Sequence, residues 1–447
     1  MTDTAQLKAD LTAKGVTTCI ASYVDMHGVS KSKFVPIGHL NQMMQGSEMF
    51  TGAALDGVPQ KINDEEVCCM PDADAHVVLP WEPTVALFPS DLWCEGKPFE
   101  ACSRNILNRQ IARAEAMGFT MNLGMEAEFF VFRDEAEGRD PVSPLAHLEK
   151  PAYDTTRLLD NFHWLGELVD AMNDLGWDVY SFDHEDGIGQ VEIDFDYADV
   201  RTMSDRYVFL RLMANAIARQ HGAYASFMPK PFGERTGSGA HFNMSLADAK
   251  TGENLFKSES DPRGCGLSTL GYQFLAGILR HLPAIMATVA PMVNSYKRLV
   301  KQGSMSGFTW APVFACYGNN NRTNAMRIPK GGGRVELRAA DSACNPYLGA
   351  AMCLAAGLEG VAENLDPGDP NTDNMYLVTD EERARRGIEM LPRTLDEAIQ
   401  AFEADELSRS VFGDAMFASW TEFKEQEWLS YLNHVSDWER TRYLRFF

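Results

Sequence analysis

The sequence predicts an α+β protein with two domains, a small strand-rich one followed by a much larger mixed one. The chain has 447 residues, which is more than one hydrophobic core usually organises. Between residues 16 and 97, short strand-like runs are interrupted by Gly, Pro and Asp. Beyond residue 100, long segments with helical periodicity alternate with further strands. We therefore expect domains at residues 1–100 and 101–447.

The first domain begins with a predicted helix over residues 4–14, which ends at Gly15. The run "TTCIASYVDMHG" that follows is typical of a strand leading into a turn. "AHVVLP" and "TVALFPS" predict two more strands before residue 97.

The second domain contains several amphipathic segments with recognisable helix ends. Asp154 is a suitable cap at the start of one of them, and Gly118, Gly176 and Gly222 are suitable stops. The predicted helices span 102–117, 154–175, 200–221, 267–289 and 347–364.

The composition excludes some classes of function. The formal net charge is −23, so the surface should repel phosphate backbones and anionic membranes, and we expect no nucleic-acid or membrane partner. No stretch approaches the 18 uninterrupted apolar residues that indicate a membrane-spanning helix, and the first residues are polar, unlike those of a signal peptide. The nine cysteines include no C-x-x-C pair, which favours reduced thiols in a cytoplasmic protein.

Four predicted strands carry polar side chains on one face, because side chains alternate with a period of two. These strands are "NLGMEAEFFVF", "GQVEIDFDY", "GAHFNMSL" and "GRVELRAAD". Each one alone could be the wet face of an ordinary antiparallel sheet. If the four belong to one sheet, however, their polar faces line a single cavity.

The acidic side chains of these strands, with one more carboxylate in "DHEDGIGQVE", form a candidate metal-binding set. Its members are Glu126, Glu128, Glu185, Glu192, His241 and Glu336. Oxygen-rich ligation of this kind favours Mg²⁺ or Mn²⁺ over zinc or copper. The Cα atoms of Glu126 and Glu128 should lie roughly 6 to 7 Å apart. That spacing suits two neighbouring metals better than one.

Positive charge is concentrated in residues 298–338 of this acidic chain. The arginines there are Arg298, Arg322, Arg327, Arg334 and Arg338. Surface ion pairing is the simpler explanation for any one of them. Five beside a carboxylate metal site indicate instead that anions are bound, and divalent metals with arginines are typical of phosphoryl transfer. Neither a Walker motif nor a G-x-G-x-x-G turn after a strand is present, so a different scaffold would hold a nucleotide.

Several motifs, in order along the chain, resemble those of the glutamine synthetase superfamily. They are "GMEAEFF", "GQVEID", "KPFGERTGSGAHFNMSL", "NSYKRL", "NNNRTNAMRIP", "GGGRVELRAADSACNPYLGAA" and "WERTRYLRFF". The resemblance implies an N-terminal β-grasp domain and a catalytic domain with a curved antiparallel sheet flanked by helices. It also implies a homododecamer of two stacked hexamers, with active sites between neighbouring subunits.

The resemblance further implies a reaction and a role for each motif residue. ATP would phosphorylate the γ-carboxylate of L-glutamate, and a nitrogen nucleophile would then displace phosphate. Two or more Mg²⁺ or Mn²⁺ ions would bind, one near glutamate through Glu128, Glu185 and Glu192, and one at the ATP phosphates through Glu126, His241 and Glu336. Glutamate would contact Glu128, Gly237, His241, Arg298 and Arg338. ATP would contact Ser245, Arg322, Arg327 and Arg334, and the catalytic arginines would be Arg298, Arg322, Arg334 and Arg338.

Two departures from the family's pattern bear on the nucleophile. Where ammonia-using members have an Asp in Met-Phe-Asp-Gly-Ser-Ser, this chain has Thr51, and where they have a Glu before Ala-Pro-Val it has Trp310. An indole face favours an alkylammonium, with its methyl group and its charge, over ammonium. We therefore predict a small organic amine as the nucleophile. The family resemblance implies methylamine or a polyamine, and we predict methylamine because the second ammonium of a polyamine would need an acid that the sequence does not identify. The alternatives are ammonia, with Asp56 replacing the lost acids, and then a polyamine.

Two other classes of function use the same residues. A two-metal hydrolase would carry a similar carboxylate set. A structural member of the fold without activity would also keep the motifs, although the retained ligand set argues against it.

Overall fold

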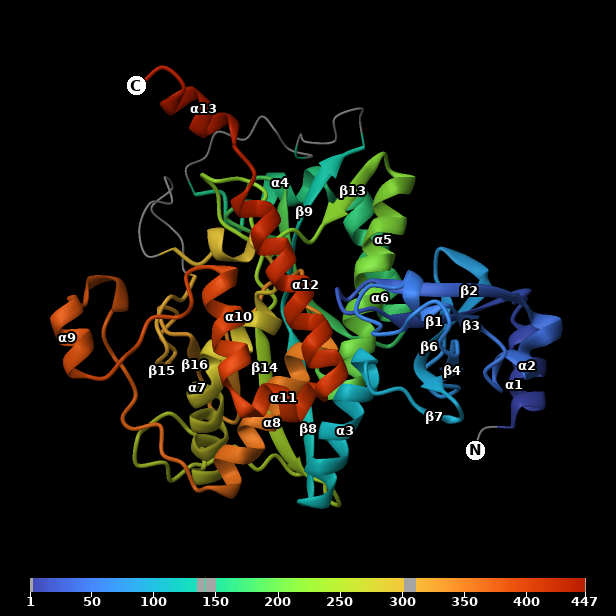
Figure 1. Ribbon diagram of the computed structural model, residues 1–447, viewed down its shortest axis with the longest axis horizontal. Coiled ribbons are helices and arrows are strands. Elements are labelled where there is room, and N and C mark those ends of the chain that lie inside the picture. Colours follow the sequence, from blue (N-terminus) through green and yellow to red (C-terminus); the bar gives the residue numbers. More distant parts are fainter. Residues whose placement is uncertain (1–2, 135–140, 142–149, 301–310, 447) are drawn as a thin grey trace.

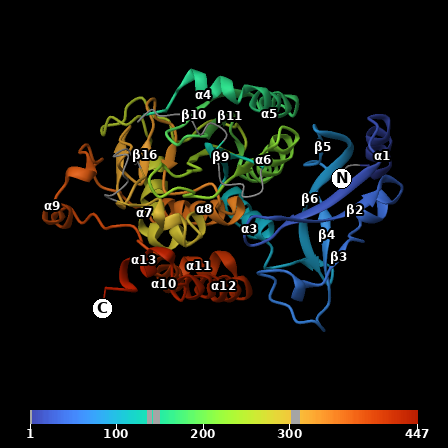
Figure 2. The ribbon, with the colours of Figure 1, turned by 90° about the horizontal axis from the view of Figure 1, so that it is seen from above.

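The computed structural model describes residues 3–134, 141, 150–300 and 311–446. A strand-rich N-terminal part stands to one side of a larger mixed part, as the blue ribbon shows in both views (Figures 1 and 2). This arrangement agrees with the predicted α+β class.

The N-terminal part is built on a mixed sheet with the strand order β2-β1-β6-β4-β3, and β5 and β7 also pair with β6. Strands β1 and β6 run parallel, and the other pairs are antiparallel. The strands are β1 (Thr18–Val24), β2 (Ser30–Pro36), β3 (Met49–Phe50), β4 (Val67–Pro71), β5 (Val77–Leu79), β6 (Glu82–Cys94) and β7 (Lys97–Pro98). Helix α1 (Thr4–Ala13) buries Leu7 and Leu11, and the side chain of Asp3 accepts a hydrogen bond from the Ala5 amide at its start. Short helices η1 (Ile37–His39), α2 (Leu40–Met43) and η2 (Gly52–Ala54) complete this part.

The larger part contains two sheets rather than one. A four-stranded sheet has the order β10-β11-β9-β13, and a six-stranded sheet has the order β12-β8-β14-β17-β16-β15. The strands are β8 (Phe119–Met125), β9 (Ala127–Arg133), β10 (Val179–His184), β11 (Gln190–Phe195), β12 (Ala198–Asp199), β13 (Ala223–Ser226), β14 (Phe242–Asp248), β15 (Tyr317–Asn319), β16 (Met326–Ile328) and β17 (Val335–Leu337). Glu126 alone separates β8 from β9, so the two sheets meet at a predicted site residue.

Helices surround these sheets. They are α3 (Ser103–Ala116), α4 (Thr155–Asp160), α5 (Phe162–Asp174), α6 (Val200–Gln220), α7 (Thr269–Val289), η3 (Ser295–Lys297), α8 (Pro346–Ala362), η4 (Met375–Leu377), α9 (Asp380–Arg385), α10 (Leu395–Ala404), α11 (Glu406–Phe412), α12 (Asp414–Leu432) and α13 (Asp437–Tyr443). The predicted helices at 102–117, 200–221, 267–289 and 347–364 are confirmed to within two residues at each end. Of the helices in the described ranges, none is both long and apolar enough to cross a bilayer.

The prediction of one helix over residues 154–175 was wrong. The chain leaves helical geometry at Asn161, whose side-chain amide donates to the carbonyl of Arg157 while its carbonyl oxygen accepts from the Trp164 indole. Asn161 therefore ends α4 and begins α5. Its competing side-chain hydrogen bonds interrupt an otherwise continuous amphipathic pattern.

Helix α8 forms the centre of the core beneath the six-stranded sheet. All of its residues except the last few are buried. A Cβ at Gly360 would come within 2.7 Å of the Gly277 amide on α7, so the glycine permits a very close approach of the two helices. The other side of α8 reaches β14, because a Cβ at Gly349 would meet the ring of Phe242. The strands of the candidate site thus rest on a tightly packed helix pair.

The buried side chain of Arg104 on α3 joins the N-terminal sheet to the larger part. Its guanidinium donates to Asp72 at 2.8 Å and Asp91 at 3.0 Å in the N-terminal part, and to both carboxylate oxygens of Asp205 on α6 at 3.0 Å. The Asn345 side chain adds hydrogen bonds to the carbonyls of Asp25 and Met26. These contacts position the small sheet against the larger part.

His281 on α7 provides a pH-dependent contact in the helical layer. Its two ring nitrogens lie 2.7 Å from Asp405 and 2.8 Å from Glu359, and Arg280 also pairs with Glu359. Burial alone would lower the pKa of His281, but its hydrogen bonds to the two carboxylates raise it above 6.5. The stabilisation is therefore complete below pH 6.5 and lost as the pH rises through the pKa of the folded state.

We expect His281→Gln to lower the unfolding midpoint most at pH 6 and progressively less toward pH 9. Thermal unfolding of both proteins across this pH range measures the difference. His434→Gln, at an exposed histidine, is the control. A difference that does not change with pH would contradict the charge-dependent role of His281.

Candidate active site

Six side chains form two adjacent groups that could each hold a metal ion. One group is Glu126, His241 and Glu336, and the other is Glu128, Glu185 and Glu192. Within each group, the potential ligand atoms lie within 4.8 Å of one another. His241 connects the groups, since its Nε2 lies 3.8 Å from Glu128 Oε1.

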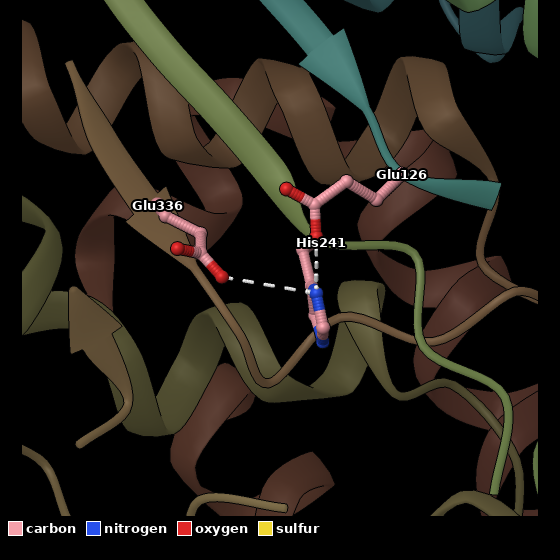
Figure 3. Close-up of side chains that lie close together, drawn as sticks. All are labelled: Glu126, His241 and Glu336. Atoms are coloured by element: carbon pink, nitrogen blue, oxygen red, sulfur yellow. Dashed lines mark hydrogen bonds and ion pairs between the residues drawn. The ribbon is translucent and has the colours of Figure 1, made fainter. Parts of the chain in front are cut away.

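The first group comes from three strands of the six-stranded sheet or their ends. Figure 3 shows the carboxylates of Glu126 and Glu336 directed toward the same ring nitrogen of His241. The Nδ1 atom of His241 lies 2.7 Å from Glu126 Oε2 and 3.7 Å from Glu336 Oε1. Burial alone would raise the pKa of Glu126, but hydrogen bonds from His241 and Asn243 lower it to about 2. Glu126 is therefore an anion at neutral pH.

The second group is held by strand register in the four-stranded sheet. Glu128 on β9 and Glu192 on β11 are directly paired across the antiparallel ladder, and Glu185 follows the end of β10. Burial, and then the nearby charges of Glu128 and Glu185, raise the pKa of Glu192 well above its usual value. Three carboxylates packed this closely repel one another, and a bound divalent cation would neutralise them. The donor set thus fits Mg²⁺ or Mn²⁺.

The chain over residues 237–241 runs alongside these ligands. The Gly239 amide donates to Glu128 Oε2 at 2.7 Å, and a Cβ at Gly239 would come within 3.0 Å of the other Glu128 oxygen. Any larger residue would therefore crowd the side chains of Glu128 and His241, which are both candidate metal ligands. Gly237 lies at the rim of the cavity, where its carbonyl accepts a hydrogen bond from Gln190 at 3.0 Å.

Glu336 is fully buried and holds two of the predicted arginines. Its carboxylate accepts from Arg327 and Arg338, each at 2.6 Å, through different oxygens. Arg298 is also buried, and it donates to the carbonyls of Ala339 at 3.0 Å and Arg338 at 2.9 Å. The guanidinium groups are thus fixed before any anion binds.

The remaining arginines are more exposed. Arg334 donates to Asn243 Oδ1 at 3.0 Å, and the Asn243 amide donates in turn to Glu126 at 2.9 Å. Arg322 lines the same cavity, and its carbonyl accepts from Arg338 at 3.2 Å. Asn243 therefore connects a predicted phosphate-binding arginine to a candidate metal ligand.

Two adjoining cavities contain these groups. The larger, about 920 Å³, is lined by Glu126, Glu128, Glu185, Glu192, Gly237, His241, Arg298, Arg322, Arg327, Arg334 and Arg338, among others. The smaller, about 310 Å³, shares Glu126 and Arg334 with it and includes Ser245. The polar faces of four strands thus meet in one region, although those strands belong to two sheets. We expected a single cavity if the four strands belonged to one sheet. The two sheets meet at Glu126, and their polar faces therefore line one region even though the strands are divided between them.

Three further carboxylates, Asp183, Asp186 and Asp194, line the larger cavity, and none of them was assigned from the sequence. Asp194 follows Glu192 on the same face of β11, and burial together with Glu126 raises its pKa to about 7. Asp183 pairs with Glu192 across β10 and β11, and burial together with Glu185 raises its pKa to about 6. The strand alternation contained the signal for Asp194. Asp183 lines the cavity because β10 pairs with β11, and the sequence did not reveal this pairing.

Of the two residues predicted for the amine pocket, the structure describes only Thr51. Thr51 is exposed in the N-terminal part, where its hydroxyl donates to Glu66 at 3.0 Å, and it is not among the described residues lining either cavity. Trp310 lies outside the described residues. Ala311, the next residue, lines the larger cavity, and its carbonyl accepts from Tyr376 at 2.7 Å.

A sequence profile described as "Glutamine synthetase, catalytic domain" matches residues 100–443. The chain belongs to the glutamine synthetase family. The resemblance predicted from the motifs is therefore confirmed.

Relatives within the glutamine synthetase family include enzymes with different names. The chain is 42% identical over 430 residues to "Glutamate--methylamine ligase" of Methyloversatilis universalis, with 96% of each chain covered. It is 36% identical over 443 residues to a glutamine synthetase of Rhizobium leguminosarum bv. phaseoli, with 98% of each covered. A glutamine synthetase of Clostridium saccharobutylicum is 37% identical over 442 residues, with 96% of each covered.

Solved structures of the family show the same fold. The structure described as "GmaS/ADP complex-Conformation 1" superposes with a TM-score of 0.92 and 38% identity, covering 99% of this chain and all of the other. "Apo GmaS without ligand" gives a TM-score of 0.90 at 36% identity, with both chains fully covered. The predicted glutamine synthetase-like fold is confirmed.

Proposed function

We propose that this protein is an ATP-dependent ligase that joins the γ-carboxylate of L-glutamate to methylamine, releasing ADP and phosphate. The main support is the pairing of two carboxylate metal groups with a cluster of arginines in one cavity. The 42% identity to a glutamate–methylamine ligase supports the choice of amine. Ammonia is the alternative nucleophile, because glutamine synthetases are 36–37% identical over similar lengths.

We assign the metals and anions by the chemistry of the side chains. Glu128, Glu185 and Glu192 would hold one Mg²⁺ or Mn²⁺ ion, and Glu126, His241 and Glu336 another. Bound there, the metal ions would neutralise the phosphates of ATP and polarise the transferred phosphoryl group.

The arginines and Gly237 would position the two substrates. Arg298 and Arg338, with Glu128, Gly237 and His241, would hold glutamate. Arg322, Arg327 and Arg334, with Ser245, would hold the ATP phosphates. Fixed guanidinium groups stabilise the charge that develops during phosphoryl transfer without reorganising. The catalytic role therefore falls to Arg298, Arg322, Arg334 and Arg338, which line the cavity.

The proposed reaction has two steps. A γ-carboxylate oxygen of glutamate attacks the γ-phosphorus of ATP, and the bond to the β-phosphate oxygen breaks, giving γ-glutamyl phosphate and ADP. The nitrogen of the unprotonated amine then attacks the acyl carbon, and phosphate leaves. The amine nitrogen loses one proton as the amide forms.

Thr51 and Trp310 are the residues we propose for the amine pocket. Thr51 lies away from the cavity of its own chain, so it would reach an amine pocket in a neighbouring subunit. This placement supports sites shared between subunits, and we propose the homododecamer of two stacked hexamers that the family resemblance implies. We also propose domains at residues 1–100 and 101–447 and, from the cysteine usage, a cytoplasmic location.

The function is tested by measuring ADP release from the purified chain with Mg²⁺, ATP and glutamate. Ammonium, methylamine, ethylamine and putrescine serve as alternative nucleophiles. We expect the highest kcat/KM with methylamine and no ADP release without both glutamate and an amine. An equal or higher kcat/KM with ammonium would overturn the choice of amine. Release of ADP or phosphate without glutamate would indicate a hydrolase.

We expect Trp310→Glu to lower kcat/KM for methylamine relative to ammonium by about 10-fold. The carboxylate removes the cation–π contact, worth about 0.5–2 kcal/mol, and supplies an acceptor that ammonium prefers. Steady-state kinetics with both amines gives the ratio. Trp438→Glu, at an exposed tryptophan, is the control. An unchanged ratio in Trp310→Glu would place Trp310 outside the amine pocket.

A further inference from the structure

A separate cavity of about 330 Å³ lies at the junction of the N-terminal sheet and helix α6. Its lining includes residues of β1, β6, α3 and α6, and it shares no lining residue with the cavity of the two metal groups. Volumes of this size and positions between structural units are typical of small-molecule sites. The chemistry of its walls determines what it can bind.

The carboxylates that line this junction cavity already have interaction partners. Asp72 and Asp205 both accept hydrogen bonds from Arg104, and Asp205 also accepts one from the Tyr347 hydroxyl at 2.6 Å. Asp74, the third acidic lining residue, also has an interaction partner. The lining therefore offers a cationic ligand no carboxylate that lacks a partner.

Two arginines of α6 also line the cavity, and among the described residues neither has a carboxylate within ion-pair distance. The charge of Arg201 contributes to lowering the pKa of Asp72. Arg206 on α6 is half-buried, and its guanidinium carbon lies 5.7 Å from the centre of the Trp177 ring. Arg201 stands near the mouth in the first turn of the same helix. Asp196 and Asp199 attract Arg206 from farther away, and Asp199 is engaged by the first amides of α6.

A half-buried arginine without a counter-ion is unfavourable, because burial disfavours the charged form. Burial indeed lowers the pKa of Arg206. In a chain with net charge −23, carboxylates are abundant, yet none pairs with this group in the described structure. A bound anion would supply the missing partner.

The rest of the cavity lining is mixed, with polar side chains at Ser22, Ser30, His76, Ser90 and Thr202 and an apolar patch beside Arg206. Leu175, Trp177, Phe209 and Leu212 line this patch. We propose that the junction cavity binds a small organic carboxylate with an apolar body, the carboxylate pairing with Arg206 and Arg201 and the body lying against Trp177 and Phe209. Trp177 also stacks on Phe195 at 5.5 Å, so the site is one aromatic contact away from β11, the strand that carries Glu192.

Isothermal titration calorimetry on the full chain tests this site. The probes are 4-methylpentanoate, 3-methylbutylamine and L-leucine, which share a branched apolar body. Saturating L-glutamate fills the substrate pocket, and ATP is left out so that no ligation occurs. We expect saturable binding of 4-methylpentanoate and none of 3-methylbutylamine. Binding of L-leucine would indicate amino acids as the natural source of the carboxylate, and its absence would indicate plain acids.

Variants locate the binding. Arg206→Gln should weaken 4-methylpentanoate binding at least ~10-fold, equivalent to about 1.4 kcal/mol. Leu212→Trp, at a partly exposed lining residue, should block the cavity and abolish binding, and it provides a second test if Arg206→Gln folds poorly. Arg219→Gln, in the last turn of α6 and outside the cavity, should change nothing. No binding of 4-methylpentanoate, equal binding of the amine, or full affinity in Arg206→Gln would overturn the proposal.

Discussion

Replacing Glu336 with glutamine is expected to reduce ATP-dependent amide formation by about 10²–10³-fold. Glu336 is fully buried, holds Arg327 and Arg338 at 2.6 Å each, and belongs to the metal group of Glu126 and His241. The neutral amide removes a metal ligand and leaves two guanidinium groups without their shared partner. Steady-state ADP release measures the loss, and calorimetric titration with Mn²⁺ measures the weaker metal binding.

Glu363→Gln is the matched control for this prediction. Glu363 also accepts from an arginine at 2.6 Å, Arg280, but it lies on the surface after α8. Activity and Mn²⁺ affinity should therefore stay within about twofold of the wild type, since surface ion pairs contribute little. Full activity in Glu336→Gln, with unchanged Mn²⁺ affinity, would contradict the assignment of Glu336 as a metal ligand.

Replacing Arg104 with glutamine is expected to destabilise the protein by about 3–5 kcal/mol, the usual cost of breaking a buried ion pair from one side. The Arg104 side chain is only 3% exposed and pairs with Asp72, Asp91 and Asp205. Without the guanidinium, three neighbouring carboxylates repel one another across the junction. Denaturant unfolding followed by tryptophan fluorescence gives the change in midpoint.

Arg113→Gln is on the same helix, and among the described residues the Arg113 side chain is hydrogen-bonded only to Gln110, so this change should leave the midpoint nearly unchanged. The pH dependence provides a second check. Burial alone would raise the pKa of Asp72, but Arg104 holds it below 3.8. The stabilisation from Asp72 is present above that pH and lost as the pH falls through the pKa of the folded state. An Arg104→Gln midpoint equal to that of the wild type at pH 7 would show that the junction does not depend on this residue.

Several long helices and the candidate metal ligands were predictable because their signals are local. Helix α6 follows the predicted 200–221 closely, since its apolar face repeats along an uninterrupted segment and Gly222 stops it. Glu128, Glu192 and Glu336 stand on strands, and Glu126 and His241 lie at strand ends, in segments whose alternation marks a polar face. The motif resemblance then divided the ligands into the two groups that the structure brings together.

Other features depend on contacts between distant segments. The side chain of Asn161 broke a helix that periodicity alone made continuous. Asp183 reaches the cavity through its pairing with Glu192 across two strands. Helices α9 to α13 were not predicted, and neither was the junction cavity beside Arg206, which exists only because the N-terminal sheet packs near α6.

The sequence by itself determined the family, several long helices and which side chains could bind metals and anions, because residue type and spacing are properties of short segments. Only the tertiary structure decided how those side chains meet. It joined two sheets at Glu126, paired Glu336 with two arginines, and placed Thr51 outside the cavity of its own chain. Those outcomes follow from strand pairing and close packing between segments far apart in the chain, which periodicity does not encode.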